Sequence, residues 1–338
     1  MRRLIFATQK LDSRDPILAA TVPKVRALAS RVDQLVVLCD SAERGVAPDN
    51  VRVHEFHAAT QFQRGARFVR ALAAELRPRP IGFVAHMIPL YVAIAAPVVK
   101  PLRIPIVLWY SHPDGHRLVR LADAAASSIL SVDRTTFPLE SRKLVAIGHG
   151  IDVDEFSCAD QREEMGRLHI LVLGRYSPIK GIDRIIQGAA LGQERGLQVA
   201  VEAYGAAGSG VHETHKRELE RLARELGVDA RLHDAVPRVA VPSLLARSDV
   251  LVNATAGPSA DKVVYEAAAS CVPPLASSPA FADLLPEELR FHRDRPQTLA
   301  DRLLQLDRRR RPDLRELVRR RHSVETWADA VLATVDSR

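Results

Sequence analysis

The sequence lacks the features that mark membrane-spanning and secreted proteins. It contains no apolar run of roughly 18 residues, the length that a membrane-spanning helix needs. The apolar part of its opening stretch, MRRLIFATQ, is too short for a signal peptide, and we interpret this stretch as a first β-strand. We therefore expect a cytoplasmic protein, either free or held peripherally at the inner face of a membrane.

Cysteine is also scarce. The chain has only Cys39, Cys158 and Cys271, and none of their spacings matches a metal-ligand or redox motif. We expect three idle or buried thiols, as in a reducing cytoplasm.

Aromatic residues make up only 5% of the chain, and no aromatic stacking pattern or nucleic-acid recognition motif accompanies its positive charge. The net charge is +7, and the arginines crowd the C-terminal part, including residues 308–311 and 319–321. Two interpretations stay open for this charge: solvated helix faces, or a basic surface that attracts acidic donors or anionic lipid headgroups. Nucleic-acid binding is not expected.

The chain is rich in apolar segments typical of β-strands, and these alternate with segments that have helical periodicity. Its 338 residues, 47% of them apolar, suit two domains with packed cores. This alternation predicts an α/β fold with doubly wound parallel sheets. The expected strands are residues 3–8, 34–40, 51–56, 81–86, 104–109, 127–132 and 143–147 in the first half, and 169–173, 197–204, 231–235, 249–253 and 289–291 in the second.

The second half is organised around residues 249–277. A buried strand there leads into a loop of small residues and then into a helix predicted over 262–270, with Asp261 at the N-cap position. Ligands of open α/β sheets bind beyond the carboxyl ends of the strands, where a helix N-terminus favours an anion such as phosphate. A second loop carries Arg175 and Lys180, five residues apart, at the start of another helix. Two such cations suit a diphosphate.

These two stretches resemble the donor site of GT-B glycosyltransferases, in particular the retaining enzymes of family 4. Glu266 and the alanines after it match the second carboxylate of the family's paired-glutamate motif, whereas Thr255 stands in place of the usual serine and Pro258 in place of the first glutamate. The resemblance implies that Arg175 and Lys180 bind the donor diphosphate and that Glu266 holds the ribose. It also implies transfer of a sugar from a nucleotide sugar to a glycan, a lipid or a small molecule.

The resemblance extends to further residues. It implies that Val263 and Val264 belong to the donor-binding helix, and that His112, at the end of a predicted strand, faces the transferred sugar. Asp261 is a second catalytic candidate, because it can take over the work of the missing carboxylate. His86 begins a weaker match to the acceptor side of the family. No nucleophile is evident, which fits the front-face mechanism generally proposed for these enzymes.

For the whole chain, the resemblance implies a GT-B fold, in which two Rossmann-like domains face each other across a cleft. We expect an acceptor-side domain at 1–148, a nucleotide-sugar-binding domain at 149–322, and a C-terminal helix at 323–338 that returns to the first domain.

No cofactor and no metal are expected. Asp152 and Asp154 fit the Asp-x-Asp pattern of metal-dependent glycosyltransferases, but that pattern needs a different fold around it. The alternative function is a catalytically degenerate protein of the same fold that only binds sugar nucleotides. Pro258 is the best support for this alternative, because it removes one carboxylate of the pair.

Overall fold

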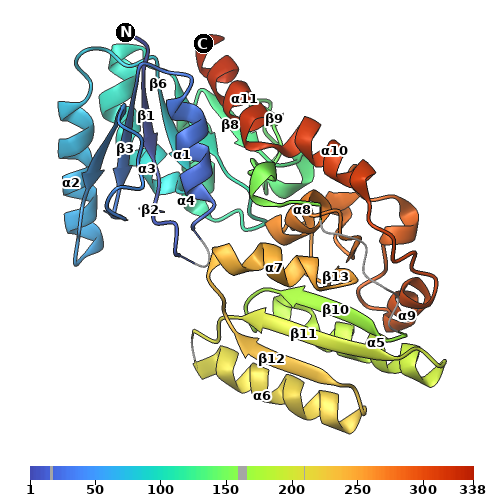
Figure 1. The fold of residues 1–338 in the computed structure, drawn as a ribbon. Coiled ribbons are helices and arrows are strands. Elements are labelled where there is room, and N and C mark those ends of the chain that lie inside the picture. The colour runs from blue at the N-terminus through green and yellow to red at the C-terminus, as the bar shows by residue number, and fades with distance from the viewer. Residues whose placement is uncertain (16–17, 159–165, 209) are drawn as a thin grey trace. The chain divides into compact units, whose positions relative to one another are not determined.

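The computed structural model describes residues 1–15, 18–158, 166–208 and 210–338. The chain forms two compact units: an N-terminal unit of Met1–Asp152 with Arg321–Arg338, and a C-terminal unit of Val153–Arg320. Each unit contains a large parallel sheet with helices packed on it (Figure 1). The predicted α/β fold class is therefore confirmed. No helix in the described ranges is both long and apolar enough to cross a membrane.

The N-terminal unit is built on a seven-stranded sheet of order β5-β3-β1-β6-β7-β8-β9, in which every neighbouring pair is parallel. All seven strands predicted for this half are present: β1 Arg3–Ala7, β3 Gln34–Cys39, β5 Val51–Glu55, β6 Gly82–His86, β7 Ile106–Trp109, β8 Ser128–Ser131 and β9 Leu144–Ala146. A second, small sheet pairs two-residue strands that are too short to leave a pattern in the sequence, β2 Lys10–Leu11 and β4 Ser41–Ala42.

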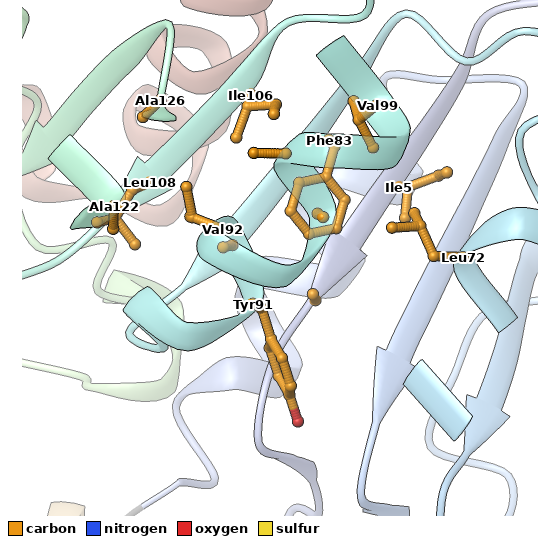
Figure 2. Packing of buried hydrophobic residues seen from close by; sticks show 14 of the residues in the cluster. Ile5, Leu72, Phe83, Tyr91, Val92, Val99, Ile106, Leu108, Ala122 and Ala126 are labelled. Atoms are coloured by element: carbon orange, nitrogen blue, oxygen red, sulfur yellow. The ribbon is translucent and has the colours of Figure 1, made fainter. Parts of the chain in front are cut away.

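The helices of this unit are α1 Thr21–Ala29, α2 Gln61–Ala74, α3 Pro89–Val99, α4 Arg117–Ala125 and α11 Val324–Asp336. A core of buried apolar side chains lies between the sheet and helices α2, α3 and α4, and Figure 2 shows part of it. Within it, Phe68 of α2 stacks on Tyr91 of α3, with ring centroids 4.5 Å apart. Burial on both faces explains why these strands are continuous apolar runs.

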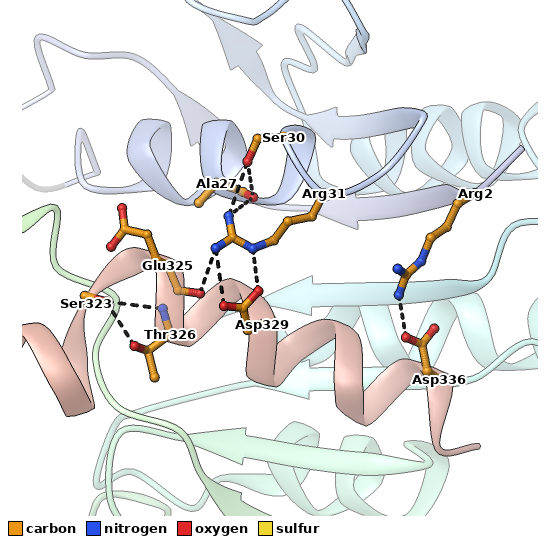
Figure 3. Close-up of polar contacts among 9 residues, drawn as sticks. All are labelled: Arg2, Ala27, Ser30, Arg31, Ser323, Glu325, Thr326, Asp329 and Asp336. Carbon is orange, nitrogen blue, oxygen red and sulfur yellow. Dashed lines mark hydrogen bonds and ion pairs between the residues drawn. The ribbon is translucent and has the colours of Figure 1, made fainter.

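The C-terminal helix α11 packs on the opposite face of this sheet. Neighbouring strand residues alternate between faces, so Phe6 of β1 points away from the core described above, and its ring meets the fully buried Trp327 of α11. Arg31, which follows the end of α1, forms an ion pair of 2.5 Å with Asp329 of α11 (Figure 3). A Cβ atom at Gly82 would lie 2.7 Å from a methyl group of α11, so glycine permits the close approach.

The C-terminal unit has a five-stranded parallel sheet of order β12-β11-β10-β13-β14. Its strands are β10 Leu168–Leu173, β11 Val199–Gly205, β12 Ala230–Asp234, β13 Val250–Asn253 and β14 Pro274–Ala276. Its helices are α5 Ile182–Glu194, α6 Gly210–Glu225, α7 Val241–Ala246, α8 Lys262–Ala269, α9 Pro296–Leu304 and most of α10 Pro312–His322. The strand predicted at 289–291 is wrong: Glu287–Leu289 is a 3₁₀ turn, and Arg290 forms one isolated bridge to Ala276.

Cys158 and Cys271 form a disulfide, with their Cα atoms 5.0 Å apart. The expectation of three thiols is therefore wrong for this pair. The two cysteines are 113 residues apart in the sequence, so no local spacing reveals that the fold brings them together. Cys39 is free and buried, as expected, and burial raises the pKa of its thiol to about 12.

Candidate functional site

The candidate site lies where the winding of the C-terminal sheet reverses. β10 lies between β11 and β13, so the chain first moves outward to one side of β10 and later returns to its other side. The loops after β10 and β13 therefore open next to each other at the carboxyl edge of the sheet, which is where open α/β sheets bind ligands. Arg175 and Lys180 lie on the first loop, and Thr255 and Asp261 lie on the second.

A glycine allows the two loops to touch. Gly181 has a φ of 63°, which an L side chain rarely adopts, and a Cβ atom there would lie 2.5 Å from the carbonyl oxygen of Ala254. The main-chain N–H of Ala256 donates to the carbonyl of Ile179 at 2.8 Å, which joins the loops directly. Arg293 joins them again, because its guanidinium donates to main-chain carbonyls of both loops. Nothing in the sequence around Arg293 indicated this role.

Asp261 is the centre of a polar network between these loops. Its Oδ2 atom accepts hydrogen bonds from Lys180 Nζ at 2.6 Å, from Thr255 Oγ1 at 2.6 Å and from Asn253 Nδ2 at 2.9 Å. Its Oδ1 atom accepts one hydrogen bond, from Ser259 Oγ at 3.1 Å. The side chains of Lys180 and Asp261 are each 17% exposed, so the pair lies largely out of solvent.

The charge of Asp261 follows from this network. Burial alone would raise the pKa of its carboxyl group, but Lys180 and the hydrogen bonds from Thr255 and Asn253 outweigh burial and lower the pKa to about 2. Asp261 is therefore ionised at neutral pH. It occupies the predicted N-cap position of α8, yet its side chain accepts no hydrogen bond from the helix N–H groups. Its carboxylate is thus committed to Lys180 rather than to capping.

The remaining predicted donor residues lie on the same edge of the sheet. Arg175 is exposed on the loop that follows β10. Val263 and Val264 lie in the first turn of α8, where the main-chain N–H of Val264 donates to the carbonyl of Asp261 at 3.2 Å. The side chain of Val264 is fully buried, so a ligand would meet this residue only through its main chain.

Glu266 lies farther along α8 and is part of an ion-pair triad. The residue is 1% exposed, and its Oε1 atom lies 2.5 Å from Nη1 of Arg238. The other side of the same guanidinium pairs with Glu155, at 2.9 Å from Nε and 2.7 Å from Nη2. Glu155 and Arg238 were not singled out from the sequence, because the contacts of Arg238 span 83 and 28 residues along the chain.

His112 follows the end of β7 in the N-terminal unit and is exposed. Its Nδ1 atom accepts a hydrogen bond from the main-chain N–H of Asp114 at 3.1 Å. A neutral imidazole in this position carries its proton on Nε2, which leaves a donor available to a ligand. Its predicted role toward the transferred sugar stays a prediction.

His86, the last residue of β6, is buried. Its ring stacks on Trp109 at 4.9 Å and lies between Thr8 Oγ1 and Lys24 Nζ, each 3.4 Å from a ring nitrogen. Burial, with Lys24 and His149 adding to it, holds the pKa of His86 well below its usual value. The ring is therefore neutral, and Nε2 faces the ammonium group as an acceptor. Its acceptor-side role stays a prediction.

Asp154 of the Asp-x-Asp segment and several of the C-terminal arginines make contacts within the C-terminal unit. Asp154 pairs with Arg319 at 2.9 Å. Other arginines of these runs bind neighbouring carboxylates or helix-end carbonyls: Arg309 binds Asp307, Arg311 binds Asp313, and Arg310 binds the carbonyls of Ala246 and Ser248. In the part of the chain that the structure describes, no group of three or more His, Cys, Asp and Glu side chains is placed to hold a metal ion.

Residues 167–308 match the family model described as glycosyl transferases group 1. This segment runs from the start of β10 to just beyond α9 and includes both loops of the candidate site. This segment is therefore similar to the group 1 glycosyltransferases. The predicted resemblance to glycosyltransferases is thereby confirmed for this domain, which contains Arg175, Lys180, Asp261 and Glu266.

Solved structures extend the likeness to the whole chain. HepE of Anabaena in complex with UDP-glucose is 17% identical, with a TM-score of 0.78 and 100% of each chain covered. Sucrose-phosphate synthase of Thermosynechococcus elongatus is 15% identical, with a TM-score of 0.76 and 98% of each chain covered. A glycosyltransferase of Rickettsia africae is 12% identical, with a TM-score of 0.75 over 99% of this chain and 98% of its own. These likenesses confirm the GT-B fold class. No curated protein sequence matches the chain.

The Lys180–Asp261 pair predicts a large coupling energy. In a double-mutant cycle of Lys180→Met and Asp261→Asn, measured by urea unfolding, we expect about 1–3 kcal/mol of coupling, because either single change leaves a partly buried charge without its partner. The exposed pair Arg221–Glu225 is the matched control, and its coupling should stay below roughly 0.5 kcal/mol. Equal coupling in the two cycles would contradict the central place given to Asp261.

Proposed function

We propose that this protein transfers a glycosyl group from a nucleoside diphosphate sugar to an acceptor, with retention of the anomeric configuration. The observation that carries the proposal is the meeting of the Arg175–Lys180 loop with the start of α8 at the reversal point of the sheet. Departure of a nucleoside diphosphate builds negative charge on its phosphates. Fixed cations and the positive end of a helix dipole at that position stabilise the developing charge. The UDP-glucose in the HepE structure is a donor of this class.

Asp261 supports a role toward the donor sugar. Its Oδ2 atom already accepts three hydrogen bonds, whereas Oδ1 accepts one from Ser259 and keeps capacity for a further donor. We propose that Oδ1 accepts a hydrogen bond from a sugar hydroxyl. It would thereby take the role of the family's first glutamate, whose position is occupied by Pro258. His112 is proposed as the second residue toward the sugar. The acceptor class stays open among glycans, lipids and small molecules.

The test begins with a screen of nucleotide sugars for release of nucleoside diphosphate by the purified protein. Once a donor is found, Arg175→Ala should lower turnover by about 10²–10³-fold, the usual effect of removing one fixed charge-stabilising donor. Arg195→Ala, at the far end of α5, is the matched control and should leave turnover unchanged.

Two outcomes would count against this proposal. Binding of nucleotide sugars with no release on any acceptor mixture would favour the degenerate binding protein. Wild-type turnover in both Arg175→Ala and Lys180→Ala would show that the diphosphate does not bind at this loop. The configuration of the product, measured by NMR at the anomeric proton, tests retention separately.

We propose further that catalysis needs no metal, because Arg175, Lys180 and the start of α8 already supply the positive charge that a diphosphate leaving group requires. Activity should therefore survive EDTA. The measurement is turnover after chelation and after adding back manganese or magnesium. Complete loss that only a metal restores would instead assign a metal role to Asp152 and Asp154.

We propose a peripheral contact with an anionic membrane for helix α4 rather than for the C-terminal arginines, several of which pair with carboxylates of their own unit. Leu118 and Leu121 are 39% and 53% exposed and lie one helical turn apart. Arg117 and Arg120 precede them and are exposed as well. A basic helix face with exposed leucines complements an anionic bilayer in both charge and polarity.

This surface predicts selective binding to vesicles. The protein should sediment with phosphatidylglycerol vesicles at low salt and much less with phosphatidylcholine vesicles, because salt and neutral headgroups weaken the attraction of the arginines. Leu118→Ser with Leu121→Ser should reduce this binding, whereas Val239→Ser, a highly exposed site of the C-terminal unit, should not. Equal sedimentation with both vesicle types would exclude the proposed contact.

A further inference from the structure

Arg238 connects three parts of the C-terminal unit that are distant in sequence. It begins the 3₁₀ turn η5, Arg238–Ala240, which follows β12. Its side chain is 10% exposed and reaches Glu266 on α8 in one direction and Glu155 on the 3₁₀ turn η3, Val153–Glu155, in the other. Its guanidinium also lies over the ring of Phe156, 5.4 Å from the ring centroid.

In this triad, the attraction of the two carboxylates for Arg238 outweighs the effect of burial. Burial would lower the pKa of Arg238, but Glu266 and Glu155 outweigh burial and raise it. Glu266 depends on the same contact, because it is 1% exposed and Arg238 is its ion-pair partner among the described residues. A carboxylate buried this deeply is costly unless a cation and hydrogen bonds match it. Arginine suits the position because its planar fork can serve two carboxylates at once.

We propose that Arg238 is a positioning residue for nucleoside recognition, which it performs by fixing the orientation of the Glu266 carboxylate. This inference rests on the proposed function, in which Glu266 meets the ribose of the donor. A fixed carboxylate accepts hydrogen bonds from ribose hydroxyls, and hydrogen bonds to a charged group are the stronger ones. Arg238 thereby sets the preference of the site for ribose over 2′-deoxyribose.

Arg238 acts through Glu266 rather than on the ligand itself. Its Nη1 faces Glu266, and its Nε and Nη2 face Glu155, so each of its three nitrogens already meets a carboxylate oxygen. This role differs from that of Arg175, because Arg175 is exposed on its loop. Loss of Arg238 should therefore change the selectivity for the nucleoside more than the affinity for the diphosphate.

The experiment measures affinity for UDP, ADP and GDP and for the 2′-deoxy form of each, by calorimetry. For the base that binds best, the wild-type protein should prefer the ribonucleotide by about tenfold or more. Arg238→Met should bring this preference close to one, Arg238→Lys should restore part of it, and Glu266→Gln should lose it in the same way. Arg319→Met, which removes a cation that pairs with Asp154, is the control and should keep the wild-type ratio.

The ratio separates a positioning role from a merely structural one, because a general loss of stability weakens both nucleotides alike. A folded Arg238→Met or Arg238→Lys variant with the full wild-type preference would overturn the inference. So would a wild-type protein that binds nucleoside diphosphates but does not distinguish ribose from 2′-deoxyribose. If the wild-type protein binds none of the nucleotides, the proposed function fails, and the inference fails with it.

Discussion

The candidate site depends on two largely buried carboxylates, one at the start of helix α8 and one within it. Each is paired with a cation from another segment. Asp261 at the start of the helix pairs with Lys180, and Glu266 within it pairs with Arg238. Neither carboxylate would be tolerated in its position without a partner, because desolvation of an unpaired charge is costly. The two ion pairs therefore connect α8 to the loops after β10 and β12. These connections position the site residues at the sheet edge, together with the strands.

The sequence was sufficient for most of the fold, because buried parallel strands leave continuous apolar runs. The inner strands of the N-terminal sheet have this character, whereas the edge strands β5 and β9 are largely unburied. Helix α4 was not predicted, although its buried residues Val119 and Ala122 have helical spacing. The predicted strand at 289–291 failed because an apolar residue pair flanks a turn that makes only one bridge to β14.

The site was predictable where its chemistry is local in sequence. Arg175 and Lys180 share one loop, and their spacing alone indicated a diphosphate site. Asp261 and Glu266 lie at the start of α8 and within it, and their roles were indicated by the resemblance to family 4. The partners that hold them were not predictable, because Arg238 reaches across 28 residues to Glu266 and Arg293 across 39 to Ala254. The same holds for Cys158 and Cys271. Long-range contacts become visible only when the strand order is known.

The arginine-rich composition has a structural use in the C-terminal unit. Short helices end with carbonyl groups that lack helical partners. In the C-terminal unit, arginines supply donors to such groups: Arg310 reaches the end of α7, and Arg315 reaches the last residue of α8 as well as the carbonyls of Val153 and Phe156. Because Arg315 connects the end of α8 to the residues next to Glu155, it supports the same helix that Arg238 and Lys180 hold. Positive charge in this unit thus fixes the position of α8, while Arg175 at the sheet edge stays exposed to solvent.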